Sequence, residues 1–116
     1  MSTFRASVSA GESGPVIMLS GEADLSSIAE LSDLVTGQLS GGTRHLTIDV
    51  SGMSFADSAS IRVLMLAAVT LQKRGGSLVL LRPHRTLARV LDIMDAQELM
   101  TIRGKAEAEA PDGCGQ

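Results

Sequence analysis

A serine follows an aspartate where a strand-like segment gives way to an apolar one. Asp57 and Ser58 lie between the run that ends at Ala56 and the segment that begins with Ile61. A helix starting here would place a hydroxyl and a carboxylate beside unpaired amides that carry roughly half a positive charge. Those amides would stabilise a phosphate on Ser58. The pair therefore indicates a phosphorylation site or a plain N-cap serine, and the two roles are compatible. Either Asp57 or Ser58 can cap the helix.

The other reactive side chains match no catalytic pattern. His45 and His84 lie in no triad motif, and neither has a second ligand at metal-binding spacing. The chain contains no Gly-x-x-x-x-Gly-Lys phosphate loop. Asp57 is expected to position the loop and to assist phosphotransfer without being a general base. We therefore expect the substrate of an enzyme and not an enzyme, with no metal and no cofactor.

Composition argues against several classes of function. The chain has 116 residues, enough for one domain with its own core, and a formal net charge of −3. Its basic residues are scattered, and without Trp or Tyr no basic stripe with stacking aromatics predicts nucleic-acid binding. Cys114 has no partner for a disulfide, and no apolar run suits a signal peptide or a membrane span. We expect a cytoplasmic protein that binds neither nucleic acid nor membrane.

The N-terminal part of the chain predicts a hairpin followed by a helix. Polar and apolar residues alternate over residues 3–9, a turn with Gly and Pro follows, and an apolar run covers 16–19. Asp24 and Ser27 both offer helix starts, and Ser27 with Glu30 fits a capping box. An apolar stripe at helical spacing then continues to a glycine pair that ends the helix.

The middle of the chain predicts a strand and the helix that carries Ser58. Residues 46–50 are expected to form a strand, with Asp49 near its C-terminal end. Asp49 would form the turn that follows the strand or, alternatively, contact a partner or phosphate. A helix is expected from residue 58 or 59 to about 74. Its inward stripe is Ile61, Leu64, Met65, Ala68 and Leu71.

The C-terminal part completes an α/β pattern. A strand is expected over 77–81, a helix start at Pro83 and a last short strand over 99–102. The order predicts a single domain over 1–103, with a mixed four- to five-stranded sheet, helices packed against it and right-handed crossovers. Residues 104–116 have no apolar side chain larger than Ala, so we expect a disordered tail.

Several residues of the 58–74 helix fall off its inward stripe. Val63, Leu66 and Ala67 do so, alongside Arg62 and Thr70. An apolar strip beside Ser58 is what a docking site for a partner would need. The alternative is that this strip packs on a neighbouring helix or that its residues are singly exposed.

Four stretches resemble the STAS domain family, in particular its small bacterial anti-sigma factor antagonists, and together cover about residues 3–102. They are Leu19-Ser-Gly-Glu-Ala-Asp24-Leu25, Leu46-Thr-Ile-Asp49-Val-Ser51, Phe55-Ala-Asp57-Ser58-Ala59, and the turn Gly75-Gly76 followed by Leu78-Val-Leu-Leu. The resemblance implies a STAS-like fold.

The resemblance also implies a function in the regulation of transcription, including stress responses. In that family an unphosphorylated antagonist binds an anti-sigma factor, often a serine kinase, and a sigma factor is released. The kinase phosphorylates the serine after the loop aspartate, which abolishes binding, and a serine phosphatase restores it. By position that serine is Ser58. Asp24 would contact the partner or cap the first helix, and the remaining partner contacts would be Asp57, Ser58, Arg62, Val63 and Leu66.

One residue departs from the family pattern. The family usually has Gly two residues after the acceptor serine, and this chain has Ser60. Its Cβ stands in the first helical turn, where a partner would need close approach, and its hydroxyl is a rival phosphoacceptor. Ser60 favours an alternative, a constitutive STAS interaction module that is not phosphorylated. A further alternative, which no residue requires, is a domain that senses a nucleotide or lipid.

Overall fold

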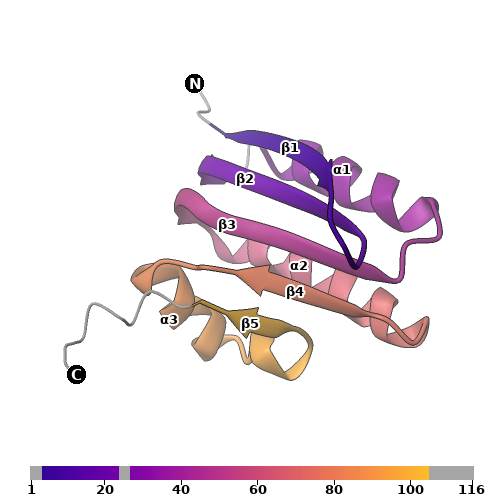
Figure 1. The fold of residues 1–116 in the computed structure, drawn as a ribbon. Coiled ribbons are helices and arrows are strands. Elements are labelled where there is room, and N and C mark those ends of the chain that lie inside the picture. The colour runs from indigo at the N-terminus through magenta and orange to yellow at the C-terminus, as the bar shows by residue number, and fades with distance from the viewer. Residues whose placement is uncertain (1–3, 24–26, 105–116) are drawn as a thin grey trace.

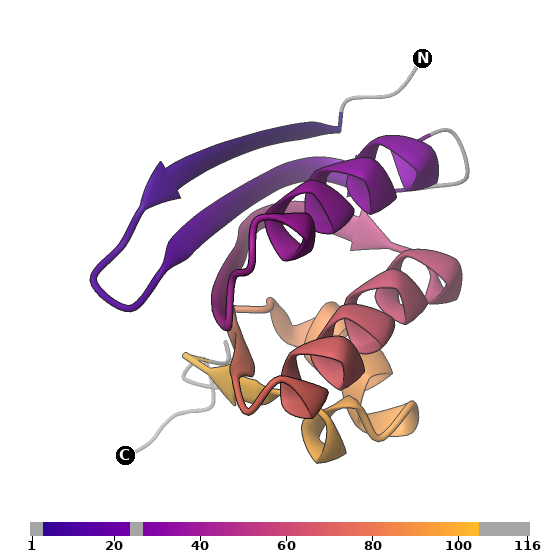
Figure 2. The same ribbon diagram turned by 90° about the vertical axis from the view of Figure 1, so that its right-hand side faces the viewer.

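The computed structural model describes residues 4–23 and 27–104. In chain order the elements are β1 (Arg5–Ala10), β2 (Pro15–Ala23), α1 (Ile28–Ser40), β3 (His45–Ala56), α2 (Ser58–Lys73), β4 (Ser77–Leu81), α3 (Arg85–Ile93), a 3-10 turn η2 (Ala96–Glu98) and β5 (Thr101–Arg103). Figures 1 and 2 show all three helices on one side of the sheet, so that its other face is open.

The sheet follows the order of the sequence, β1-β2-β3-β4-β5. β1 and β2 form the predicted antiparallel hairpin, and every later pair of neighbours is parallel. A helix lies between the members of each parallel pair because parallel strands need a long crossover. The predicted mixed sheet with helices against it is therefore confirmed, with five strands.

The core is aliphatic and lies between the sheet and the helices. Ile17, Ile48 and Leu80 are neighbours in register across β2, β3 and β4, and all three are fully buried. The helices contribute Leu31 and Val35 from α1, Ile61, Leu64, Ala68 and Leu71 from α2, and Leu87 and Leu91 from α3. The inward stripe predicted for α2 is confirmed, except that Met65 is only half-buried.

Two strands are longer than the alternation of apolar residues predicts. β2 continues past Leu19 to Ala23, and β3 continues past Val50 to Ala56. The two extensions pair with each other, and β3 carries one extra residue opposite Met18–Ser20 and another opposite Gly21–Glu22. Each extension contains a Ser-Gly pair, and this pattern in the sequence predicts a turn. The pair is extended in the structure because it pairs with the neighbouring strand. The extension of β3 carries the chain directly to Asp57.

Two predicted helix starts differ from the structure in detail. Ser27 is the N-cap of α1, as one of the two expected starts, but its side chain is almost fully buried and makes no cap hydrogen bond, so the Ser27 half of the expected capping box does not form. α3 begins two residues after Pro83, with His84 as its N-cap. The Nδ1 atom of His84 accepts the backbone N–H of Leu87 at 3.4 Å.

Asp49 lies inside β3 on the open face, and the prediction that it ends a strand is wrong. Its side chain is 5% exposed, accepts the backbone N–H of Ser51 at 2.9 Å and forms an ion pair with Arg82. Arg82 has a left-handed backbone, with φ 56°, and its N–H donates to the carbonyl of Arg103 at 2.7 Å. Burial alone would raise the pKa of Asp49, but the hydrogen bonds from Ser51 and the charge of Arg82 outweigh it and lower the pKa.

The C-terminal boundary of the domain stays a prediction. β5 ends at Arg103, and nearly all of the tail expected over 104–116, including Cys114, lies outside the described residues. Within the described residues, no helix is long and apolar enough to cross a bilayer.

The Asp49–Arg82 pair gives the fold a measurable dependence on pH. Because the folded pKa of Asp49 lies below the unfolded value of about 3.9, its charge stabilises the fold at neutral pH, and this contribution is lost as the pH falls from about 5 through the folded pKa. Asp49→Asn should lower the free energy of unfolding at pH 7 by about 1–2 kcal/mol and flatten the acid side of the stability profile. Urea unfolding at a series of pH values measures both effects. Asp33→Asn, at an exposed position of α1, is the control, and equal profiles for the two variants would contradict the role of the pair.

Candidate functional site

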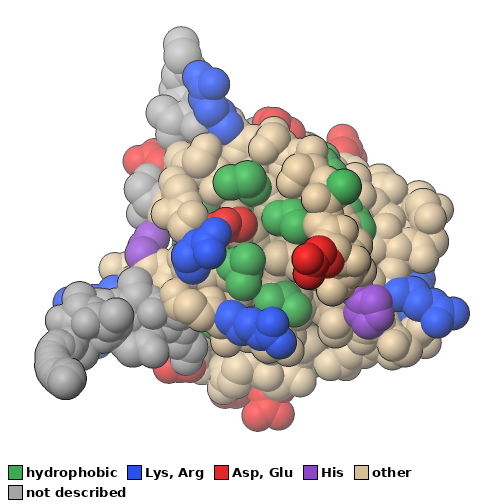
Figure 3. Space-filling view, in the orientation of Figure 1, with side chains coloured by type: hydrophobic (Ala, Val, Ile, Leu, Met, Phe, Trp, Pro, Cys, Tyr) green, Lys and Arg blue, Asp and Glu red, His purple; other side chains and the backbone are tan. Residues whose placement is uncertain are grey.

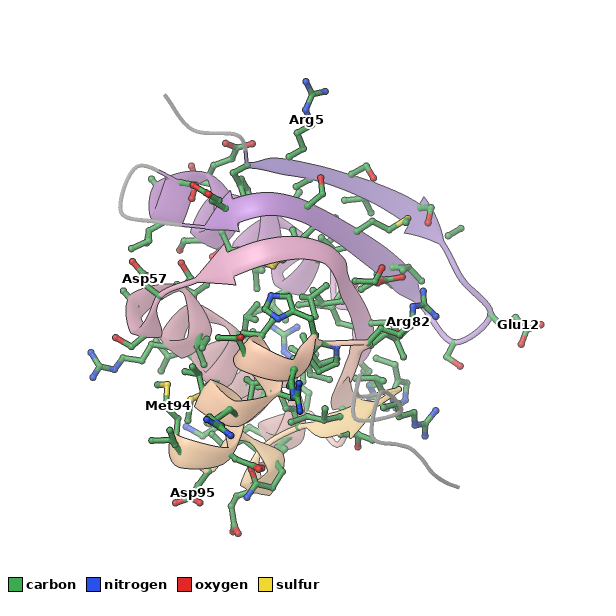
Figure 4. All side chains as sticks on the ribbon, turned by 90° about the vertical axis from the view of Figure 1, so that its left-hand side faces the viewer. Arg5, Glu12, Asp57, Arg82, Met94 and Asp95 are labelled. Atoms are coloured by element: carbon green, nitrogen blue, oxygen red, sulfur yellow. The ribbon has the colours of Figure 1, made fainter. Side chains whose placement is uncertain are left out.

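The start of α2 is fixed by Asp57. The residue has an extended backbone, with φ −87° and ψ 174°, and its Oδ1 accepts the N–H of Ser60 at 2.9 Å. Its carbonyl accepts the N–H of Ile61 at 3.2 Å. Asp57 is therefore the N-cap, and the interpretation of Ser58 as a plain N-cap serine is wrong. Figure 4 shows Asp57 at the junction of β3 and α2, at the edge of the molecule.

Ser58 is the first residue of α2, and its side chain is exposed. It lies in the first turn, where backbone N–H groups have no partner within the helix and the helix dipole is positive. Because Asp57 already provides the cap, the Ser58 hydroxyl is not needed for that purpose. The hydroxyl is thus open to another protein and sits where an anion is stabilised.

Ser60 faces the interior. It is 1% exposed, and its Oγ has no hydrogen-bond partner among the residues that the structure describes. The Cβ that replaces the glycine of the family pattern therefore points into the protein and away from any partner at the surface. The expected steric obstacle does not arise.

An exposed stripe continues from Ser58 along α2. Arg62 is exposed one turn after Ser58, and Leu66, one further turn along, is 67% exposed. Residues four apart lie on the same side of a helix. We call Ser58, Arg62 and Leu66 the α2 stripe.

A groove runs beside the α2 stripe, between α1 and α2. It has a volume of about 200 Å³ and is lined by Ser32, Val35, Thr36, Leu39, Val63, Leu66, Ala67 and Thr70. Ala67 is 3% exposed and Val63 is half-buried, because α1 packs against this side of α2. The alternative of packing on a neighbouring helix is therefore correct for Ala67, whereas Leu66 remains at the surface.

The other expected site residues lie elsewhere. Asp24 falls outside the described residues. Asp49 precedes Asp57 by eight residues of mostly extended chain, about 25 Å, so it does not share the site of Ser58. The sequence interpretation missed Ile93 on α3, which is 74% exposed; its neighbour Met94 lies on the same side of the molecule as Asp57 in Figure 4. The only sequence signal for Ile93 was that it is an apolar residue outside the stripe that Leu87 and Leu91 form on α3.

The described residues contain no group of three His, Cys, Asp or Glu side chains that could hold a metal ion. The sequence analysis did not predict an exposed contact at the starts of β3 and β4. There the Nδ1 of His45 lies 3.1 Å from the Oγ of Ser77.

Comparison with known proteins identifies the family. The family model described as "Mlab, STAS domain" matches residues 6–102, and the chain belongs to the STAS domain family. The anti-sigma-B factor antagonist of Staphylococcus aureus is a relative with 23% identity over 93 residues, which cover 80% of this chain and 86% of the relative.

Solved structures share the fold. An anti-sigma factor antagonist from Mycobacterium paratuberculosis has a TM-score of 0.77 and 19% identity, over 86% of this chain and 85% of that protein. The Bacillus cell fate determinant SpoIIAA in its phosphorylated form has a TM-score of 0.68 and 20% identity, over 86% and 90% of the two chains. The predicted STAS-like fold is confirmed.

Loss of the cap should destabilise the protein. Asp57→Ala removes the acceptor for the Ser60 N–H and should lower the free energy of unfolding by about 1 kcal/mol. Ser58→Ala should change it by no more than a few tenths, because Ser58 is not the cap. Urea denaturation of both variants provides the measurement, and a larger loss for Ser58→Ala than for Asp57→Ala would contradict the assignment.

The buried hydroxyl of Ser60 should be dispensable for folding. A buried hydroxyl without a hydrogen bond costs about 1–3 kcal/mol, so Ser60→Ala should leave the free energy of unfolding unchanged or raise it by about 1 kcal/mol. Thermal unfolding monitored by circular dichroism tests this, and clear destabilisation by Ser60→Ala would show that the hydroxyl has a partner.

Proposed function

We propose that this STAS protein is an anti-sigma factor antagonist that acts by binding and not by catalysis. Its unphosphorylated form binds an anti-sigma factor with serine kinase activity and so frees a sigma factor. Phosphorylation of Ser58 abolishes the binding, and a serine phosphatase reverses it. The observation that carries the proposal is the exposed hydroxyl of Ser58 beside a cap that Asp57 already provides. The antagonists among its relatives support the class of function.

Accessibility favours Ser58 over Ser60 as the phosphoacceptor. A kinase must place the acceptor oxygen in line with the γ-phosphate of ATP. The hydroxyl must therefore project from the surface of its own protein. Ser58 meets this condition as it stands. Ser60, at 1% exposure, would reach a kinase only if the first turn of α2 opened.

The phosphate would act through charge and bulk, with little refolding. It adds about −1.5 to −2 charges, and the N-terminus of α2 stabilises an anion at this position. Arg62 lies one turn along the α2 stripe, within the spacing at which helical side chains pair. Phosphorylated Ser58 would therefore engage Arg62 within the same chain and withdraw that cation from an acidic group on the partner.

The apolar end of the α2 stripe provides the remainder of the proposed contact. Leu66 is 67% exposed and borders the groove between α1 and α2. An apolar side chain of the partner could cover Leu66 and enter this groove. Burial of Leu66 would provide affinity for the partner, and the charge on Ser58 would control the binding. One surface of α2 would therefore serve both purposes.

A constitutive interaction module is the second candidate, and the observation that favours it is Ser60 in place of the usual glycine. It shares the binding surface but predicts that affinity does not respond to charge at position 58. The two candidates therefore differ in one measurable quantity.

Affinity for the anti-sigma factor separates these candidates. The partner is captured with the wild-type protein, purified and titrated by calorimetry. Ser58→Ala should bind as tightly as wild type, whereas Ser58→Asp should weaken binding at least tenfold, or about 1.4 kcal/mol. Leu66→Glu should also weaken binding, and Asp33→Arg, at an exposed position of α1, is a control on another surface. Equal affinity of Ser58→Asp and wild type would favour the constitutive module.

A further inference from the structure

β1 forms one edge of the sheet, and its outer side has no strand beside it. The strand order begins with β1, which pairs with β2 alone among the described strands. Figure 1 shows no described segment beyond β1 in the plane of the sheet. The strand at the opposite edge, β5, has three residues, whereas β1 has six. The β1 edge is therefore the longer template for pairing with another strand.

The turn of the hairpin determines which backbone groups of β1 point toward β2. The N–H of Gly11 donates to the carbonyl of Gly14 at 2.9 Å. The next pair, Ala10 and Pro15, is not a hydrogen-bonded pair, because proline has no N–H to donate. Hydrogen-bonded and non-hydrogen-bonded pairs alternate along an antiparallel ladder. The odd-numbered residues of β1 therefore bond to β2, and the even-numbered residues direct their N–H and C=O groups to the open edge.

The open edge fits only an extended chain. Ala6, Val8 and Ala10 each offer one backbone donor and one backbone acceptor, spaced every second residue as in a β-ladder. Sheet edges are usually protected by Pro, by charged side chains or by a bulge. β1 contains no Pro, its one charge is Arg5 at its start, and its pairing with β2 has no register shift. Such an unprotected edge is suited to the addition of another strand.

The sequence of β1 is complementary to itself. Residues 6–10 read Ala-Ser-Val-Ser-Ala, the same in both directions. Two copies paired antiparallel about Val8 would place Val8 opposite Val8, each Ala6 opposite Ala10 and each Ser7 opposite Ser9. The Val and Ala pairs are the positions whose backbone groups face the open edge, so this register would form about six hydrogen bonds between the copies. The palindrome and the hydrogen-bonding pattern thus select the same register.

We propose that β1 pairs with β1 of a second copy of this chain and joins the two five-stranded sheets into one. A two-fold axis through Val8, perpendicular to the sheet, relates the copies, and this self-complementary contact closes after two. The pairing lies in the plane of the sheet, so it leaves uncovered the apolar side chains that Figure 3 shows over the middle of the open face. It also leaves the α2 stripe uncovered, because α2 packs against β3 and β4.

The helix side of the edge has room for the two Val8 side chains. Val8 is 43% exposed and lines an open hollow between the hairpin and the end of α1. The lining that α1 contributes includes Gly37 and Gly41. A Cβ at Gly37 would have no atom within 4 Å. Pairing about Val8 would therefore bury an exposed apolar side chain against its own counterpart without displacing α1.

The short contact sets the expected strength. Five paired residues extend over about 17 Å, so the buried area is smaller than the roughly 800 Å² per partner of a standard stable interface. We expect a reversible dimer with a dissociation constant of about 1 µM to 1 mM. Added salt should change it little, because backbone hydrogen bonds and not charge pairs hold the copies together.

Sedimentation equilibrium of the full chain, from about 10 µM to 1 mM, tests the proposal. Wild type should show a reversible monomer–dimer equilibrium. Val8→Pro removes an N–H that points to the open edge and leaves the ladder with β2 intact, as Pro is tolerated on an edge strand in this orientation. It should raise the dissociation constant at least about tenfold. Val8→Thr keeps the N–H and the β-branched shape, so this matched control should dimerise as wild type does.

The register has a test of its own. Ser7 and Ser9 are both exposed, and each would lie opposite the other residue in the second copy. Ser7→Lys combined with Ser9→Lys would place like charges opposite each other and should raise the dissociation constant at least about tenfold. Ser7→Lys combined with Ser9→Glu would place opposite charges there and should dimerise at least as tightly as wild type.

A wild type that stays monomeric at every concentration would overturn the proposal and leave the edge to an extended segment of another protein. A dimer indifferent to Val8→Pro would place the contact on another surface, and equal affinities of the two double variants would overturn the register about Val8. Circular dichroism of each variant excludes unfolding as the cause. None of these results depends on Ser58 or on an anti-sigma factor.

Discussion

The hydrogen bond from the Ser60 amide to the carboxylate of Asp57 sets the residue at which α2 begins. Because Ile61 and Leu64 of this helix pack into the core, Ser60 lies inside, and Ser58, about 200° around the helix from it, lies at the surface. Arg62 and Leu66 then follow Ser58 along the outer surface, while Ile61 and Leu64 enter the core. Ser58, Arg62 and Leu66 thus share the outer surface of α2, and the Ser58 hydroxyl is left open there because Asp57 and not Ser58 is the cap.

The sheet positions this cap at the edge of the molecule. β3 extends to Ala56 by pairing with β2, and the apolar residues in its first half are buried in the core. The same strand carries Asp49 on its other face, where Arg82 offsets the burial of a carboxylate. The helix side of the sheet therefore holds the proposed partner site.

Local patterns in the sequence predicted the parts of the fold that depend on neighbours in the chain. The spacing of Ile61, Leu64 and Leu71 gave the buried side of α2, and Asp57-Ser58 gave its start to within one residue. The errors arose where distant segments decide. Burial of Ala67 depends on α1, and the Ser-Gly pair at 51–52 is extended only because β2 lies beside it. Asp49 and Arg82 are 33 positions apart, so no local pattern could pair them.

Phosphate mapping tests the central claim most directly. The wild-type protein and its Ser58→Ala and Ser60→Ala variants are incubated with ATP and the anti-sigma kinase captured with the wild type, and the site is located by fragment-ion mass spectrometry. We expect one phosphate on Ser58 in wild type and in Ser60→Ala, and none in Ser58→Ala. Phosphate on Ser60, or full phosphorylation of Ser58→Ala, would contradict the assignment of Ser58 as the phosphoacceptor.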